Sequence, residues 1–371
     1  MTPSVADKTA FAPGVAGTLA FLDRLKLKGP ANDGLAELHI ELTHACNLKC
    51  PMCHHWRMKN PPPGKLLNAQ TLDTILSGTE KLDNIKAVTL TGGEPFLRPD
   101  FAEIALLLHR RFPKAALGAL SNFQSPELVL RRLRELRAAG IKMFWLGSSL
   151  DGLGAEHDRM RGVKGAYANL LRTTELLKKE FPEINFGFNF TLTPDNASGL
   201  FETYLAMAAK NLWLGAQLVV NQENLPAQEY HWSETARAEA VAQIERVLTH
   251  ICFAERSFEL INTGRTAEKP WLWTQLAYWA KLREYALKPR RLFENCGAGR
   301  RYAMLAPDGE LFFCPGKKHL AAGNVRAEGF DAAWDSQKAR TIRKTLSAKK
   351  CHCWLHCIAN PVLEQAVGAL K

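Results

Sequence analysis

Alternation of strand and helix patterns over the first 220 residues constrains the fold most strongly. Six short, largely apolar runs are predicted strands: 36–43, 86–91, 115–120, 142–150, 184–193 and 213–220. Helical patterns follow the first five of them, at 69–82, 100–112, 126–139, 166–180 and 197–210. Strands joined through helices pair in parallel. The sequence therefore predicts an α/β fold, a partial (β/α)6 TIM-like barrel.

Composition fits this prediction and excludes a membrane-spanning protein. The chain has 371 residues, of which 46% are hydrophobic and 23% charged. No apolar run approaches the roughly 20 residues that cross a bilayer, and the N-terminus lacks the basic region of a signal peptide. We therefore expect a cytoplasmic protein.

The net charge of +11 has two interpretations. Basic runs at 130–137 and 288–301 are either solvated helix faces or a surface for an acidic partner or a membrane surface. The sequence contains no nucleic-acid-binding motif, so we expect no nucleic-acid partner.

Nine cysteines form two groups, apart from Cys252, which is expected in the core. The first group, Cys46, Cys50 and Cys53, follows the first predicted strand, at the barrel end where catalytic residues collect. In a cytosolic protein, clustered cysteines indicate metal sites rather than disulfides. A structural zinc ion would need four ligands. Three thiolates suit an iron–sulfur cluster with one open iron.

The stretch "ELTHACNLKCPMC" (41–53) resembles the signature of radical S-adenosylmethionine enzymes. That resemblance implies that Cys46, Cys50 and Cys53 bind a [4Fe–4S] cluster, whose fourth iron takes the amino and carboxylate groups of S-adenosylmethionine. Met52 departs from the pattern, because many members have an aromatic residue there. It is apolar and can still pack near the adenine.

Motifs after the later strands strengthen the resemblance. They are "GGE" (92–94), "SNF" (121–123) and "SSLDGLGAEHDRMRG" (148–162). The family implies cofactor-binding roles for six of their residues: Gly92, Gly93, Glu94, Asn122, Ser149 and Arg161. For His157 and Asp158 the alternative is a capped turn in a loop.

The second cysteine group resembles a SPASM or twitch domain. Cys296 and Cys314 flank an Asp-Gly hairpin in "APDGELFFC", and "CHCWLHC" supplies Cys351, Cys353 and Cys357. Five cysteines imply one auxiliary [4Fe–4S] cluster. We expect Cys296, Cys314 and Cys357 as ligands, with Cys353 or Cys351 as the fourth. Cys353 and Cys357 would share a helix face. A zinc site is the alternative.

The predicted organisation has four parts: an N-terminal extension at 1–35, the barrel at 36–220, a helical linker or substrate region at 221–295, and a small C-terminal iron–sulfur domain of β-hairpin plus helix at 296–371.

The resemblance implies an enzyme that cleaves S-adenosylmethionine reductively and abstracts a hydrogen atom from a substrate. A small molecule or a lipid-linked substrate is the first hypothesis, and a ribosomally made peptide is the alternative. A non-catalytic electron carrier is a third. An external one-electron donor of flavodoxin or ferredoxin type is implied as a partner.

Overall fold

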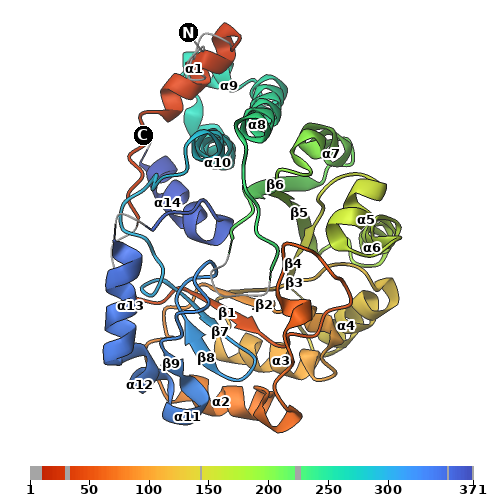
Figure 1. Ribbon diagram of the computed structural model, residues 1–371, viewed down its shortest axis with the longest axis vertical. Coiled ribbons are helices and arrows are strands. Elements are labelled where there is room, and N and C mark those ends of the chain that lie inside the picture. The colour runs from red at the N-terminus through yellow and green to blue at the C-terminus, as the bar shows by residue number, and fades with distance from the viewer. Residues whose placement is uncertain (1–10, 30–33, 143, 222–226, 349–350, 370–371) are drawn as a thin grey trace.

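A single mixed sheet organises the molecule (Figure 1), which is a computed structural model. The structure describes residues 11–29, 34–142, 144–221, 227–348 and 351–369. The sheet has nine strands in the order β6-β5-β4-β3-β2-β1-β7-β8-β9. Its strands are β1 (Glu37–Glu41), β2 (Ala87–Thr91), β3 (Ala116–Leu120), β4 (Trp145–Ser149), β5 (Asn185–Leu192), β6 (Trp213–Leu218), β7 (Tyr302–Leu305), β8 (Glu310–Phe312) and β9 (Gly323–Asn324).

The first six strands form the predicted partial barrel, and the predicted fold class is confirmed. β1 to β6 all pair in parallel with their neighbours. The crossover helices between them are α2 (Ala69–Ser77), α3 (Phe101–Arg111), α4 (Pro126–Ala138), α5 (Ala155–Arg161), α6 (Ala166–Glu180) and α7 (Leu200–Ala208). Since β6 and β9 end the strand order, the sheet remains open.

The C-terminal hairpin continues the barrel sheet. β7 pairs in parallel with β1, from Glu37 opposite Tyr302 to Ile40 opposite Leu305, and β8 then pairs antiparallel with β7. The sequence predicts the hairpin but not its attachment to β1. The small domain is therefore joined to the barrel through backbone hydrogen bonds as well as through packing.

The remaining helices lie outside the barrel crossovers. They are α1 (Pro13–Leu22), α8 (Glu234–Ala254), α9 (Ser257–Asn262), α10 (Pro270–Leu287), α11 (Val325–Glu328), α12 (Phe330–Asp335), α13 (Gln337–Ser347) and α14 (His356–Gly368). Helix α1 packs with α8, α9 and α10 at the top of Figure 1, and α14 packs on α10. Within the described residues, none of the helices combines the length and the apolar character needed to cross a bilayer.

Alternation along β1 gives the sheet a polar face beside the site. Leu38 and Ile40 are fully buried, and they alternate with Glu37, His39 and Glu41. Successive strand side chains point to opposite faces, so the three polar residues share one face. Burial lowers the pKa of His39 to about 4 despite the nearby Glu41, which favours the charged ring. This face therefore carries a neutral imidazole.

Candidate functional site

The three-cysteine loop begins where β1 ends and is fixed by its own hydrogen bonds. The Thr43 hydroxyl accepts from the Ala45 amide at 3.0 Å, and the Asn60 side chain accepts from the His44 amide at 2.7 Å. Trp56 Nε1 donates to the carbonyl of Cys50 at 2.8 Å. The loop geometry is thus set by the chain itself.

The thiols of Cys46, Cys50 and Cys53 lie near one another in this loop. Burial raises the pKa of each thiol, that of Cys46 to about 11. The neighbouring thiols raise the pKa of Cys46 further, since charge on Cys50 and Cys53 disfavours ionisation of Cys46. Metal binding deprotonates thiols and compensates such a cost. The donor set therefore suits an iron–sulfur cluster.

The two glycines after β2 are required by the close approach of the cysteine loop. A Cβ on Gly92 would lie 2.3 Å from the Thr43 carbonyl oxygen, and one on Gly93 would lie 2.3 Å from that of Ala45. The Gly93 amide donates to Thr43 at 2.7 Å. The φ of Gly92 is +129°, a region that favours glycine. These glycines hold the cysteine loop, a role that the sequence interpretation did not include.

Glu94 lies buried between the loops that follow β2 and β3. Its carboxylate accepts from the Asn122 amide at 2.7 Å and from the Phe96 amide at 3.2 Å. Burial raises its pKa to about 7, although these hydrogen bonds favour the charged form. Glu94 is therefore poised to change charge near neutral pH.

Asn122 connects that carboxylate to the cysteine loop. Its side-chain amide donates to Asn47 Oδ1 at 2.7 Å and lies 3.6 Å from Cys46 Sγ. The structure thus brings Asn122, Glu94 and Cys46 together, as expected from the motifs, which place all three at one cofactor site.

Arg161 reaches the cysteine loop from α5. Its Nη1 lies 3.7 Å from Cys50 Sγ, and its guanidinium forms an ion pair with the fully buried Asp151. Lys49 also donates its amide to the Arg161 carbonyl at 3.1 Å. Ser149, at the end of β4, is only partly buried, and its backbone pairs with Asn189.

The loop interpretation of His157 and Asp158 is wrong, because both lie in α5. His157 Nδ1 accepts from the Asp151 amide at 3.2 Å. Asp158 accepts from the Gly165 and Tyr167 amides at 2.7 and 2.8 Å, so its carboxylate orients the start of α6. Both residues have structural partners.

Among the described residues, buried polar atoms without a protein partner lie just after β3, near the end of β4 and within β5. They include Gln124 Oε1, Ser148 Oγ and Asn189 Oδ1. Native proteins satisfy nearly all buried polar atoms. The carboxyl ends of these strands therefore suit a polar ligand such as S-adenosylmethionine.

Four of the five C-terminal cysteines surround an apolar cavity between the hairpin and α14. Its lining includes the four cysteines Cys296, Cys314, Cys351 and Cys353. Burial raises the pKa of the Cys314 thiol to about 12, and the thiols of Cys296 and Cys351 add to the shift. Within the described residues, no three side chains of His, Cys, Asp or Glu lie close enough to hold a single metal ion.

Cys357 does not line this cavity. It lies in α14, where its partly buried thiol is next to Tyr302 and Glu37 and close enough to Cys314 for that thiol to raise its pKa. The predicted shared helix face with Cys353 is wrong, because α14 begins at His356 and Cys353 precedes it.

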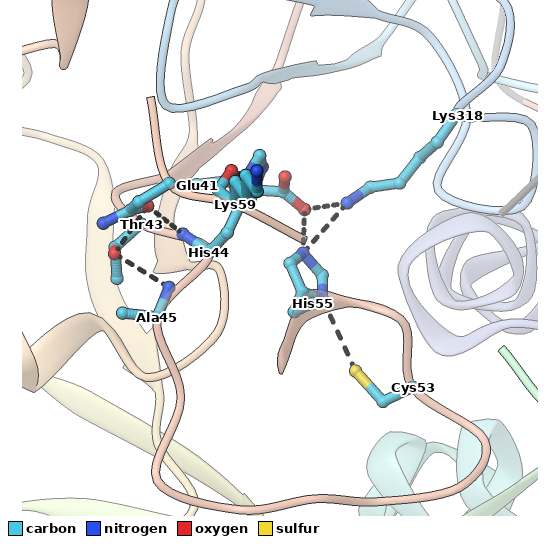
Figure 2. Close-up of polar contacts among 9 residues, drawn as sticks. Glu41, Thr43, His44, Ala45, Cys53, His55, Lys59 and Lys318 are labelled. Carbon is cyan, nitrogen blue, oxygen red and sulfur yellow. Dashed lines mark hydrogen bonds and ion pairs between the residues drawn. The ribbon is translucent and has the colours of Figure 1, made fainter. Parts of the chain in front are cut away.

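Sequence reasoning missed two residues beside the first cysteine group, His55 and Lys318 (Figure 2). His55 Nδ1 lies 3.5 Å from Cys53 Sγ, and Lys318 forms an ion pair with Glu41. Burial opposes ionisation of Glu41, yet the ammonium of Lys318 holds the pKa of Glu41 well below its usual range. The sequence "CHHW" (53–56) does place His55 beside a predicted cysteine ligand, but no local sequence pattern identifies Lys318.

Comparisons with known proteins agree with this geometry. The model of the radical SAM superfamily matches residues 40–204, and that of the SPASM iron–sulfur cluster-binding domain matches residues 296–357. An AdoMet-dependent heme synthase of Methanosarcina barkeri (strain Fusaro / DSM 804) is 27% identical and covers 82% of both chains. The mycofactocin maturase MftC of Mycobacterium ulcerans (strain Agy99) is 30% identical, over 84% of this chain and 78% of its own.

A solved structure shares the fold. Native anSMEcpe with bound AdoMet and the Cp18Cys peptide superposes with a TM-score of 0.57 at 15% identity, over 90% of this chain and 100% of that one. The motifs, the sheet and the two matched models lead to one conclusion. The chain belongs to the radical SAM superfamily and carries a C-terminal SPASM iron–sulfur domain.

Proposed function

We propose that this enzyme generates a 5′-deoxyadenosyl radical and abstracts a hydrogen atom from a small organic molecule. One observation carries the proposal: Cys46, Glu94 and Asn122 meet at the carboxyl ends of β1, β2 and β3. Three thiols and a buried carboxyl at one edge suit an open-iron cluster beside a bound ammonium.

When bound, the cluster and S-adenosylmethionine supply one-electron carbon–sulfur bond cleavage, which yields methionine and the radical. The protein's own residues bind and orient the cluster and S-adenosylmethionine. Cys46, Cys50 and Cys53 would hold three irons of the cluster, and the Glu94 carboxylate would accept from the ammonium of S-adenosylmethionine. Arg161, beside Cys50, is the proposed partner of the cofactor's carboxylate.

Ser149 and Asn122 are proposed to contact the remaining polar groups of the cofactor. Gly92 and Gly93 act indirectly, because they allow the chain at residues 43–45 to pass close by.

For the auxiliary [4Fe–4S] cluster we propose Cys296, Cys314, Cys351 and Cys353 as the four ligands. These four thiols line one cavity, whereas Cys357, although it lies close to Cys314 and Cys353, is outside that lining and has its thiol beside Tyr302. This choice replaces Cys357 in the sequence-based ligand set. One cluster uses four of the five cysteines.

A small-molecule substrate is favoured by the similarity to a heme synthase over 82% of both chains. The similarity to the maturase MftC, together with the peptides bound in the solved structures of anSMEcpe and SuiB, favours a peptide as the second candidate. Both classes need the same barrel site, so substrate identity is a separate question from radical formation.

A reducing compartment and an external donor complete the proposal. All nine cysteines lie in the described chain and none forms a disulfide, which suits the cytoplasm. A flavodoxin- or ferredoxin-like protein is the proposed donor, and the net charge of +11 suits an acidic partner of this kind.

The experiment is anaerobic turnover of the iron-reconstituted protein with dithionite. We expect 5′-deoxyadenosine from the native chain and from Cys314→Ala, and none from Cys50→Ala, because a cluster lacking a ligand cannot hold the cofactor at its open iron. Metal analysis should give about eight irons per chain, since each cubane holds about four. Stoichiometric zinc at the C-terminus, or no 5′-deoxyadenosine from a folded, cluster-loaded native protein, contradicts the proposal.

A deuterated substrate identifies the class. Transfer of deuterium into 5′-deoxyadenosine from a labelled porphyrin precursor supports the small-molecule candidate. Transfer from a labelled precursor peptide supports the second candidate instead.

A further inference from the structure

A chain of polar side chains links the auxiliary domain to the first cysteine group (Figure 2). Lys318 lies four residues after Cys314 and pairs with Glu41 at the end of β1. Lys318 Nζ also lies 3.2 Å from His55 Nε2, and His55 Nδ1 lies 3.5 Å from Cys53 Sγ. The function proposed above uses neither His55 nor Lys318.

Burial distinguishes this chain of contacts from a surface ion pair. The side chains of Lys318, Glu41 and His55 are only 8%, 4% and 12% exposed. Removing an ammonium and a carboxylate from water is costly, so each group must find its partners within the protein. The contacts of these three side chains therefore define their hydrogen positions.

Hydrogen-bond directions at the lysine end leave two arrangements. An ammonium only donates and a carboxylate only accepts, whereas a ring nitrogen does either. His55 Nε2 lies 3.2 Å from both Lys318 Nζ and Glu41 Oε1. A hydrogen on Nε2 would point at Glu41 but leave Nε2 as a second donor facing the ammonium. A bare Nε2 accepts from Lys318, and the same ammonium also donates to Glu41. In that arrangement Nε2 and Glu41 Oε1 are two acceptors that share the lysine as their donor.

The other ring nitrogen decides between them. Cys53 bound to iron is a thiolate, which only accepts hydrogen bonds. Nδ1 must then carry the hydrogen, and a neutral ring with its hydrogen on Nδ1 has a bare Nε2. This is the arrangement in which Lys318 donates to the ring. A doubly protonated ring would again place an N–H against the ammonium.

We propose that Lys318 is a positioning residue that fixes the His55 tautomer, so that Nδ1–H donates to the Cys53 thiolate of the S-adenosylmethionine-binding cluster. The inference rests on the proposed role of Cys53 as a ligand. Hydrogen bonds to cluster sulfurs raise the reduction potential, because they stabilise the more negative reduced state. The auxiliary domain thereby helps to make the first cluster reducible.

The test compares reduction potentials in the full-length, cluster-loaded protein. Lys318→Met removes the donor, so His55 can move its hydrogen to Nε2 and present a bare Nδ1 to the thiolate. We expect the reduced-to-oxidised ratio of the first cluster at fixed potential to fall about tenfold, which is about 59 mV for a one-electron couple. EPR-monitored titration measures it. Lys344→Met, which removes an exposed ammonium from α13, is the matched control.

Repeating the lysine substitution in a His55→Phe protein separates the effect of the His55 tautomer from the effect of the Lys318 charge alone. The His55→Phe protein lacks the hydrogen bonds from Lys318 to His55 and from His55 to Cys53. Adding Lys318→Met to it should therefore shift the reduction potential much less than Lys318→Met does in the native protein. An equal shift in both backgrounds would mean that Lys318 acts only through its charge, and this overturns the inference. So does an unchanged potential in Lys318→Met.

A spectroscopic measurement needs no lysine variant. Pulsed EPR of the reduced native enzyme in deuterated buffer, with ¹⁵N-labelled histidine, should detect an exchangeable deuteron and a nitrogen coupled to the first cluster. Both signals should vanish in His55→Phe and persist in Lys344→Met. Their absence from the native enzyme overturns the inference even if Lys318→Met does not fold. Iron content and absorbance report separately whether Cys53 holds a cluster, so a protein with no cluster there refutes the proposed function as well.

Discussion

Burial of Glu94 gives the site a charge that depends on pH. With its pKa raised to about 7, the carboxyl is neutral below that value and ionised above it. A cofactor ammonium pairs with the ionised form. Binding of S-adenosylmethionine should therefore strengthen as pH rises through about 7 and weaken as pH falls through it. Equilibrium dialysis about one unit to either side checks the direction, and a pH-independent affinity would contradict it.

Replacing Glu94 with Gln tests the same carboxyl at constant pH. A charge-assisted hydrogen bond contributes about 1.5–3 kcal/mol, so we expect roughly 10- to 150-fold weaker binding with both clusters retained. The amide oxygen can still accept from the Asn122 or Phe96 amide, which protects the fold. Unchanged affinity would assign Glu94 a purely structural role.

At the scale of elements, the start of α14 separates Cys353 from Cys357. Leu355 is the N-cap and makes no side-chain capping bond, so the sequence holds no local signal for this boundary. Packing sets it instead, because Trp354 is buried and its Nε1 donates to the carbonyl of Tyr278 at 3.1 Å. The spacing of the cysteines could therefore not identify the ligand set.

The cavity lining predicts different outcomes for neighbouring cysteines. Cys351→Ala should lose the auxiliary cluster, about four irons per chain, whereas Cys357→Ala should retain it, because only Cys351 lines the cavity. Iron analysis after reconstitution measures this difference, with circular dichroism as the folding control. Loss of the same iron in Cys357→Ala would return Cys357 to the ligand set.

At the scale of the whole molecule, the sheet couples the two cysteine groups. The alternating patterns predicted all six barrel strands, since periodicity is local. They could not predict that residues 302–305 pair with 37–40, because nothing near either segment specifies a partner more than 260 residues away in the chain. Likewise, the sequence could not predict the ion pair of Lys318 with Glu41, because the hairpin brings these two distant residues together.

Removing residues 296–371 should therefore destabilise the barrel itself. It would leave β1 with an unpaired edge, which favours aggregation. We expect the truncated protein to be insoluble or to have a lower melting temperature. Its loss of thermal stability should be larger than that of Cys314→Ala, which keeps β7. Thermal unfolding followed by circular dichroism compares the two. A truncated protein as stable as the full chain would show that the pairing with β7 contributes little.

The pairing of β1 with β7 also restricts how such a protein can be recombined. An auxiliary domain transplanted from a relative would have to bring a strand whose register and side chains fit β1, because this strand completes the recipient's sheet. Exchange at the start of the C-terminal segment would thus fail more often than exchange within the loops at the carboxyl ends of the strands. New substrate preferences in this architecture are accordingly more accessible through loop replacement than through domain shuffling.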